Sequence, residues 1–219
     1  YHEDMNQRDT LELQLNVFAD FQPALPASHR AAQYVFLANI DPRLQARVLD
    51  QLAAPGVIGC DTMNHWIASS RGELEQLLDR VGILVINDEE ARLLSGERNV
   101  VRAARRLLAM GPHRVLIKRG EYGVIQFSAN SVFAVPAFPL ERVFDPTGAG
   151  DTFAGGFMGE LARSGDMSEA GLRRAIVYGS VMASFVVEDF GLARLRALTQ
   201  DAIQYRYRQF VSLTDIDGA

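Results

Sequence analysis

The sequence predicts an α/β fold built on a mostly parallel sheet, and two observations support that prediction. Short apolar runs alternate along the chain with longer segments whose apolar residues recur at helical spacing. Strands interleaved with helices in this way form βαβ units, in which the strands run parallel and helices cover the sheet. A chain of 219 residues, 48% hydrophobic and 22% charged, is long and apolar enough for one such domain. We therefore expect a three-layer αβα sandwich.

The first segment of the chain has a different pattern. Residues 10–18 alternate between apolar and polar side chains, as a half-buried strand does. Pro23 and Pro26 then interrupt the pattern before the longer apolar runs begin. We expect residues 1–26 to form a partial lid strand and a linker, and residues 27–219 to form the main domain. An exposed lid strand would also allow a homodimer through paired lid strands.

The strands of the main domain are expected at its short apolar runs. Strands of a parallel sheet are buried on both faces, so they lack polar alternation. The runs that fit are residues 34–38, 57–60, 83–86 and 115–118. Two later segments, residues 123–127 and 132–135, predict a hairpin of further strands.

Helices are expected between and after these strands, where apolar residues recur three and four positions apart. The first begins at Pro42, because proline suits the first turn of a helix. In chain order the helices are expected near residues 42–53, 72–81, 89–94, 100–110, 149–163, 168–188 and 199–210. In a parallel sheet connected in this way, ligands bind at the carboxyl ends of the strands.

The overall composition argues against several classes of protein. The net charge is −5, so there is no basic surplus to bind the phosphate backbone of nucleic acid. The apolar runs are shorter than the roughly 20 residues of a membrane span. The single cysteine, Cys60, is consistent with a reducing compartment, so a cytoplasmic location is expected. The chain opens without an initiator methionine, from which we expect a segment upstream of Tyr1.

The strongest chemical signal lies in residues 145–156, which read Asp-Pro-Thr-Gly-Ala-Gly-Asp-Thr-Phe-Ala-Gly-Gly. Small residues precede a long predicted helix there, so the free N–H groups around Ala149 to Asp151 would face an anion such as phosphate. An aspartate in the same turn is suited to accept the proton of a hydroxyl that attacks the phosphate. Asp151 is therefore the candidate base, although an aspartate at a helix start also stabilises the helix dipole.

Two other phosphate-binding motifs are absent from this sequence. The Walker loop requires Gly-Lys followed by Ser or Thr, whereas the only lysine, Lys118, stands between Ile117 and Arg119. The dinucleotide fingerprint requires a third glycine where this chain has Phe153.

The run at residues 145–156 resembles the second signature of the PfkB/ribokinase family of carbohydrate kinases. The resemblance implies a ribokinase-like three-layer αβα sandwich with a remnant of a small β lid. It also implies transfer of the γ-phosphoryl group of ATP to a sugar-type hydroxyl. In that family the aspartate of Gly-Ala-Gly-Asp is the catalytic base, which corresponds to Asp151. The preceding amides form an anion hole, which corresponds to Gly148, Ala149 and Gly150.

Asn87 and Glu90 follow the apolar run at residues 83–86 and resemble the Asn-x-x-Glu motif of the family. The motif implies that these two residues organise Mg²⁺ through water, since Mg²⁺ prefers a few carboxylates and retained waters. The same spacing also matches a capping box at a helix start. Asp145 lies where relatives hold a monovalent cation such as K⁺, although Asp-Pro also favours a turn.

Further family resemblances concern the nucleotide and the substrate. The strand and glycine turn at residues 115–123 resemble a nucleotide-contacting loop, and the helix and glycine turn at residues 178–191 resemble the segment beside adenine. The implied nucleotide-binding residues are Lys118, Gly120, Gly123, Ser180 and Gly191. Asp61 and Asn64 follow a predicted strand and resemble positions of a subgroup of unassigned sugar kinases that reach substrate. Helix capping is the alternative for both.

The resemblance runs over essentially all of the sequence, but the family's amino-terminal substrate aspartate and Gly-Gly signature are not in it. An amino-terminally truncated kinase is therefore expected. Two alternatives stay open. A nucleoside kinase of the same fold differs only in the acceptor, and a non-catalytic remnant would bind nucleotide without transferring phosphate.

Overall fold

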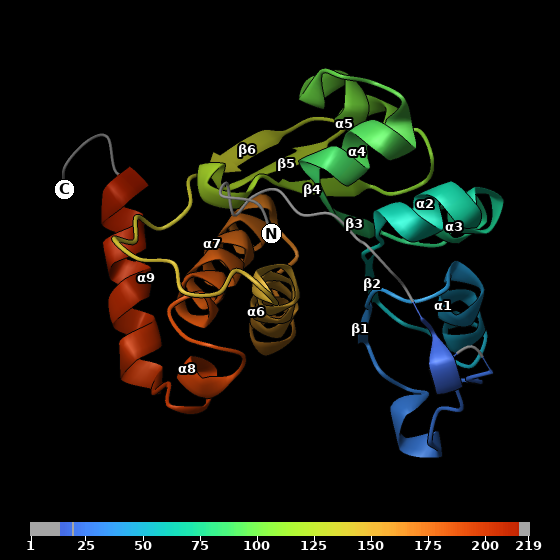
Figure 1. Cartoon of the computed structure of the whole chain (residues 1–219), viewed down its shortest axis with the longest axis horizontal. Helices are drawn as coiled ribbons and strands as arrows, with labels where there is room; N and C mark the ends of the chain where they lie inside the picture. Colours follow the sequence, from blue (N-terminus) through green and yellow to red (C-terminus); the bar gives the residue numbers. More distant parts are fainter. Residues whose placement is uncertain (1–13, 19, 215–219) are drawn as a thin grey trace.

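A six-stranded sheet separates two layers of helices in the computed structural model, which describes residues 14–18 and 20–214 (Figure 1). The strand order follows the sequence, β1-β2-β3-β4-β5-β6. The strands are β1 (Tyr34–Leu37), β2 (Val57–Cys60), β3 (Ile83–Asn87), β4 (Arg114–Lys118), β5 (Val124–Ser128) and β6 (Val132–Val135). The first four run parallel, and β4, β5 and β6 pair antiparallel. The predicted α/β fold, the four parallel strands and the hairpin are confirmed.

Five helices cover one face of the sheet. They are α1 (Pro42–Leu49), α2 (Asn64–Ser69), α3 (Arg71–Leu78), α4 (Asp88–Ser95) and α5 (Val100–Leu108). Right-handed crossovers between consecutive parallel strands place their connecting helices on the same side. Leucines of α3, such as Leu74 and Leu78, are fully buried there against Leu84 and Ile86 of β3.

The opposite face is covered by the helices that follow the hairpin. They are α6 (Ala149–Ser164), α7 (Glu169–Val186), α8 (Ala193–Arg196) and α9 (Gln200–Thr214). A second core cluster forms there, which includes Phe157 and Phe185 of the helices and Val85 and Leu116 of the sheet. The three long helices were expected from the sequence, whereas the short helices α2 and α8 were not.

Helices α6 and α7 lie close together because glycines face each other at their contact. A Cβ built on Gly156 would lie 3.1 Å from the Cα of Gly179, and one built on Gly179 would lie 2.8 Å from the carbonyl oxygen of Phe153. Neither position has room for a side chain without a shift of its neighbours. The contact packs α6 against α7 within two turns of the start of α6, which carries the candidate base.

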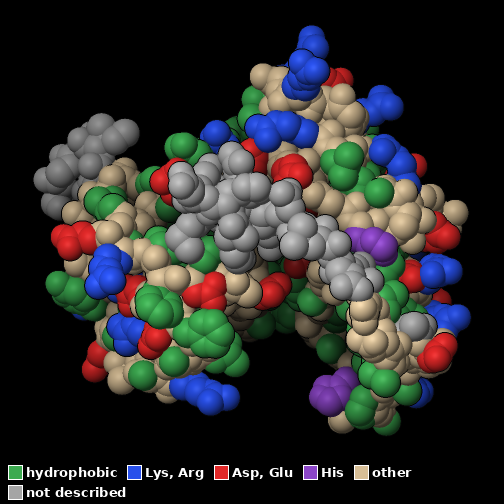
Figure 2. Space-filling view, viewed as in Figure 1, with side chains coloured by type: hydrophobic (Ala, Val, Ile, Leu, Met, Phe, Trp, Pro, Cys, Tyr) green, Lys and Arg blue, Asp and Glu red, His purple; other side chains and the backbone are tan. Residues whose placement is uncertain are grey.

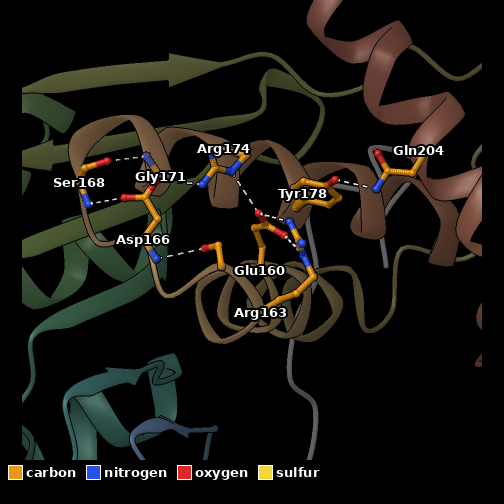
Figure 3. A network of polar contacts seen from close by, with 9 residues as sticks. Glu160, Arg163, Asp166, Ser168, Gly171, Arg174, Tyr178 and Gln204 are labelled. Atoms are coloured by element: carbon orange, nitrogen blue, oxygen red, sulfur yellow. Dashed lines mark hydrogen bonds and ion pairs between the residues drawn. The ribbon is translucent and has the colours of Figure 1, made fainter.

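A polar network fastens the other end of the same helix pair (Figure 3). The carboxylate of Glu160 is buried and accepts hydrogen bonds from Arg163 at 2.8 Å and from Arg174 at 3.1 Å. Arg174 also pairs with Asp166 at 2.9 Å, in the loop between α6 and α7. Tyr178 of α7 accepts from Gln204 of α9 at 2.7 Å. The network joins α6, α7 and α9 into one layer.

The strand predicted for residues 10–18 is wrong for the described residues 14–18. Residues 14 and 15 are in neither a strand nor a helix, and the 3₁₀ helix η1 (Asn16–Phe18) follows them. Asn16 has a φ of 49°, which breaks an extended chain, and Val17 is 93% exposed, so no half-buried face exists. Residues 10–13 lie outside the described residues. The lid, the domain boundary at residue 26 and the lid-strand dimer stay predictions.

Strand β1 is less buried than its apolar sequence suggested. Only Leu37 of its four residues is buried, since β1 lies at one end of the strand order and has a single strand neighbour, β2. In the space-filling view the molecule is hollowed between the side of α6 and α8 and the side of β1 and α1 (Figure 2). Tyr34 and Phe36 are only partly buried against the second core cluster.

Candidate active site

The candidate site lies where the carboxyl ends of the parallel strands meet the first turn of α6. Asp61 follows β2, Asn87 ends β3 and Lys118 ends β4, and Asn87 and Lys118 are paired in register. The charges of Lys118, Asp151 and Glu90 all act on the Asp61 carboxyl. Groups from four separate elements are therefore brought together, as expected for the ligand edge of a parallel sheet.

The turn before α6 exposes backbone amides. Gly148 is the N-cap residue with a φ of 80°, a left-handed conformation that favours glycine. The first turn of a helix leaves its amides without intrahelical partners. The Ala149 amide donates to the Pro146 carbonyl at 3.2 Å, whereas those of Gly150 and Asp151 have no acceptor among the described residues. Two amides of the predicted cradle are therefore available to an anion.

Asp151 lies in this turn with its side chain exposed. Its neighbour Thr152 donates its amide to the Gly148 carbonyl at 2.9 Å, which closes the first helical bond. The structure thus places a carboxylate at the open mouth of the helix, beside the unpaired amides. The helix start that the sequence motif predicted is confirmed, and the roles of Asp151 as base and of the amides as anion hole stay predictions.

Lys118 reaches the same turn from the end of β4. A Cβ built on Gly150 would stand 2.6 Å from the Nζ of Lys118 and 3.7 Å from its Cε. Glycine at position 150 therefore leaves room for the ammonium group as well as exposing its own amide. No pattern in the sequence places the lysine beside this particular glycine.

Asp61 is the buried acid of the site, with 5% of its surface exposed. Burial is the main cause that raises the pKa of its carboxyl to about 7; the charge of Lys118 opposes this rise, and the charges of Asp151 and Glu90 add to it. Its Oδ1 atom has no hydrogen-bond partner among the described residues. Gln45 of α1 donates its side-chain amide to the Asp61 carbonyl at 3.2 Å, which fixes the backbone there.

The loop after β2 offers further unpaired oxygen atoms. The hydroxyl of Thr62 and the Oδ1 of Asn64 are both buried without a partner in the described part of the chain. The Asn64 amide donates to Glu89 of α4 at 3.0 Å. Asn64 is the first residue of α2, so it does not cap that helix. Thr62 was missed by the sequence analysis, because a threonine in a short loop carries no distinctive pattern.

Asn87 and Glu90 form a capping box at the start of α4. The Asn87 side chain accepts from the Glu90 amide at 2.7 Å, and the Glu90 carboxylate accepts from the Asn87 amide at 2.9 Å. The capping box, which was the alternative interpretation of this Asn-x-x-Glu spacing, is confirmed. A role of the pair toward Mg²⁺ stays a prediction.

Asp145 and Gly191 are brought together on the far side of the turn. The Asp145 carboxylate accepts from the Thr147 amide at 2.9 Å, and this bond, followed by those from the Thr147 hydroxyl and the Gly191 amide, lowers the pKa of Asp145. The Phe144 amide donates to the Val187 carbonyl at 2.7 Å. The segment before α6 is therefore tied to the turn after α7.

Three of the predicted nucleotide residues have structural roles of their own. The Ser180 hydroxyl donates to the Ile176 carbonyl in its own helix at 3.1 Å. Gly123 has a φ of 83°, and a Cβ there would overlap the carbonyl oxygen of Val135, so the β5–β6 hairpin requires this glycine. Gly120 begins the 3₁₀ helix η3 (Gly120–Tyr122) and is exposed. A nucleotide contact by any of them stays a prediction.

Within residues 14–18 and 20–214, no group of three or more His, Cys, Asp or Glu side chains could hold a metal by itself. Among the same residues, no helix combines the length and the apolar character needed to cross a membrane.

Several known proteins are similar to this chain in sequence. The profile of the pfkB family carbohydrate kinases matches residues 6–197. The cytidine kinase of Thermococcus kodakarensis is 32% identical over 182 residues, which are 80% of this chain and 65% of the relative. The ribokinase of Bacillus subtilis is 35% identical over 124 residues, 57% of this chain and 39% of the relative. The chain therefore spans less than two thirds of the length of these relatives.

Solved structures share the fold. The nucleoside kinase of Methanocaldococcus jannaschii, an archaeal member of the ribokinase family, superposes with a TM-score of 0.69 at 20% identity, over 89% of this chain and 60% of that one. A ribokinase II from E. coli in complex with ATP and Mg²⁺ superposes with a TM-score of 0.62 at 25% identity, over 78% of this chain and 53% of that one.

Proposed function

The chain belongs to the pfkB family of carbohydrate kinases, and from that premise we propose that it carries the phosphotransfer site of an ATP-dependent sugar kinase. The observation that carries the proposal is the exposed Asp151 carboxylate, set beside the unpaired amides of Gly150 and Asp151 at the start of α6. A carboxylate repels a phosphate that is merely bound. A carboxylate can instead act as a base, accepting the proton of a hydroxyl that attacks phosphorus.

In the proposed reaction, Asp151 accepts the proton of the acceptor hydroxyl. The hydroxyl oxygen forms a bond to the γ-phosphorus of ATP while the bond from that phosphorus to the bridging oxygen breaks, and ADP leaves with the bond electrons. The amides of the 148–151 turn neutralise the negative charge of the phosphoryl group in transfer. The amides already point out of the turn because Gly148 has a left-handed conformation and the first helical bond is closed by Thr152.

Mg²⁺ fits the donors on this edge of the sheet. Asn87 and Glu90 are the residues proposed to order the ion and its waters, and an ion that retains waters does not need the larger acidic cluster that the described residues lack. When bound with ATP, Mg²⁺ neutralises charge on the phosphates. Asp145 is proposed for a monovalent cation such as K⁺, since the Thr147 and Gly191 amides keep its carboxylate ionised.

The nucleotide is proposed to lie along the ends of β4 and α7. The residues proposed at the end of β4 are Lys118, Gly120 and Gly123, and those proposed in and after α7 are Ser180 and Gly191. The acceptor is proposed to lie near the loop after β2, where Thr62 and Asn64 present buried oxygen atoms without donors. Such oxygens accept hydrogen bonds from substrate hydroxyls, and a site built to do so rejects analogues that lack them.

A nucleoside is the second candidate acceptor. The specific observation in its favour is that the longer of the two curated matches described above is to a cytidine kinase, at 32% identity over 182 residues. A sugar and a nucleoside share the hydroxyl that receives the phosphoryl group, so the chemistry assigned to Asp151 is the same for both.

The test is an acceptor screen with radiolabelled ATP on the full-length protein, followed by Asp151→Asn with the best acceptor. We expect turnover to fall by about three orders of magnitude or more while ATP affinity changes little, because a base contributes typically 10²–10⁴-fold. Asp201→Asn is the matched control, since Asp201 is an exposed acid in the first turn of another helix, α9. Equal turnover in Asp151→Asn and the control would refute the role of Asp151.

A further inference from the structure

Lys118 carries a positive charge that the described residues leave unpaired. It is the only lysine in the sequence. Arginines elsewhere form ion pairs, for example Arg206 with Glu188 at 2.6 Å. No hydrogen bond or ion pair to Lys118 is present in residues 14–18 and 20–214. Its ammonium group instead lies against Gly150, where the first turn of α6 presents free amides.

Asp61 is the acidic side chain whose charge is opposite to that of Lys118. Its side chain is buried, with 5% of the residue exposed, and its Oδ1 has no hydrogen-bond partner among the described residues. Of the charged groups that act on it, Lys118 has the strongest influence and is the one that favours the ionised carboxylate. A buried carboxylate without a partner is costly, so a cation close to it has a stabilising role.

The sheet places the two side chains at the same edge, where their charges act on each other although no ion pair joins them in this structure. Asp61 follows β2 and Lys118 ends β4, with β3 between them. Neighbouring strands lie about 4.8 Å apart, so the two strand ends are separated by roughly 10 Å. A lysine side chain is long enough to extend over the end of β3 toward Asp61 and the α6 turn. Its compact ammonium group then acts as a point charge.

We propose that Asp61 is a positioning residue whose negative charge draws the Lys118 ammonium over the first turn of α6 without an ion pair, so that the ammonium contacts the phosphoryl group in transfer. The proposal rests on the kinase function proposed above and assigns Asp61 a different task from substrate binding. It also explains Gly150, since any side chain at that position would displace the ammonium. A cation fixed at the point where charge develops lowers the barrier without reorganisation.

A double-mutant cycle tests the link between the two residues. Lys118→Met, Asp61→Asn and the double variant of the full-length protein are compared at saturating ATP·Mg²⁺ with the acceptor found by the screen. Each single variant is expected to lose about 10²-fold in kcat, with little change in the acceptor KM. The double variant is expected to match Lys118→Met, because Asp61 acts through the lysine. Lys118→Arg should recover part of the loss.

Two outcomes of the cycle would overturn the proposal. If the losses of the single variants multiply in the double variant, Asp61 and Lys118 act independently. If Asp61→Asn raises the acceptor KM and leaves kcat unchanged, Asp61 binds the acceptor directly.

A second measurement needs no turnover. The ammonium of Lys118 is observed by nuclear magnetic resonance in full-length protein labelled with ¹⁵N-lysine, and its signal is the one missing from Lys118→Arg. The signal is expected to shift with ATP·Mg²⁺ and to differ in Asp61→Asn, but not in the control Asp201→Asn. An unchanged signal in Asp61→Asn, or no response to ATP·Mg²⁺ that calorimetry shows to be bound, would rule out the positioning role. If both shifts occur but no acceptor is phosphorylated, the kinase function fails while the coupling of Asp61 with Lys118 stands.

Discussion

The Nζ of Lys118 lies so close to Gly150 that a Cβ on the glycine would stand 2.6 Å from it. The glycine before the candidate base therefore has two tasks. It exposes a backbone amide at the start of α6, and it leaves space for the ammonium group of a residue on the neighbouring strand β4.

Gly150→Ala is expected to lower turnover by about tenfold or more with little loss of stability. The new methyl group would push aside the end of the Lys118 side chain, which is flexible and moves at low cost. Alanine also favours a helix over glycine by up to about 1 kcal/mol. Steady-state kinetics and thermal unfolding measure the two effects.

Gly159→Ala is the matched control for that substitution, since a Cβ at this exposed position of α6 meets nothing within 4 Å. It should keep full turnover and gain stability from helix propensity. A loss of turnover as large as that of Gly150→Ala would show that the effect comes from the helix and not from Lys118.

Asp61→Asn is expected to change how stability depends on pH. The carboxyl has a pKa of about 7 in the folded protein against 3.8 when exposed, so between these values the folded state holds a proton that the unfolded state has lost. The stability associated with that proton is present below about pH 4 and is lost as the pH rises through 7. Asparagine does not titrate. The variant should therefore gain stability relative to the parent across this range, by a few kcal/mol at most.

Urea unfolding at pH 4.5 and pH 8, compared with the same experiment on Asp201→Asn, measures this difference. A stability difference between Asp61→Asn and the parent that stays constant with pH would contradict the raised pKa. A variant that is more stable yet less active would be typical of a residue kept for function.

Gly179→Ala is expected to destabilise the protein by about 1–3 kcal/mol through overpacking. Its Cβ would lie 2.8 Å from the Phe153 carbonyl oxygen and 3.0 Å from the Phe153 ring. The backbone of α6 must shift to make room. Denaturant unfolding gives the change, and a variant as stable as Gly159→Ala would show that the two helices do not depend on this contact.

Glu160→Gln is expected to cost about 1–3 kcal/mol, because the buried carboxylate serves both Arg163 and Arg174 (Figure 3). The arginines are partly exposed and stay hydrated, which limits the loss. Glu75→Gln removes the exposed pair with Arg71 and should cost less than about 1 kcal/mol. Equal unfolding free energies for the two variants would contradict the importance of burial.

Cys60 is expected to resist thiol reagents in the folded protein. Its side chain is fully buried, and burial, followed by the charge of Asp61, raises the pKa of the thiol. The thiolate that reacts is therefore scarce as well as inaccessible. Labelling with a chromogenic disulfide should proceed at the rate of unfolding and become fast in urea. Rapid labelling of the native protein would disprove this burial.

The sequence by itself determined the layered α/β fold and the start of α6. Four short apolar runs, such as residues 83–86, are typical of strands buried on both faces. The helical segments between them require right-handed crossovers, which make these strands parallel neighbours. The turn around Gly148 and Asp151 is likewise local, since φ preferences and helix-start amides depend on adjacent residues. The strand expected at residues 10–18 failed in its described part because alternation alone supplies no partner strand.

Only the tertiary structure decided which side chains share the site. Asp61 and Lys118 are 57 positions apart, and no periodicity connects them. They lie at the same edge because β2 and β4 flank β3 in the sheet, and α6 crosses the opposite face to place Gly150 against the lysine. Burial of Asp61, which raises its pKa, is also a property of the packed sheet and its surroundings. Local patterns fix local conformation, whereas proximity and desolvation arise from packing between distant segments.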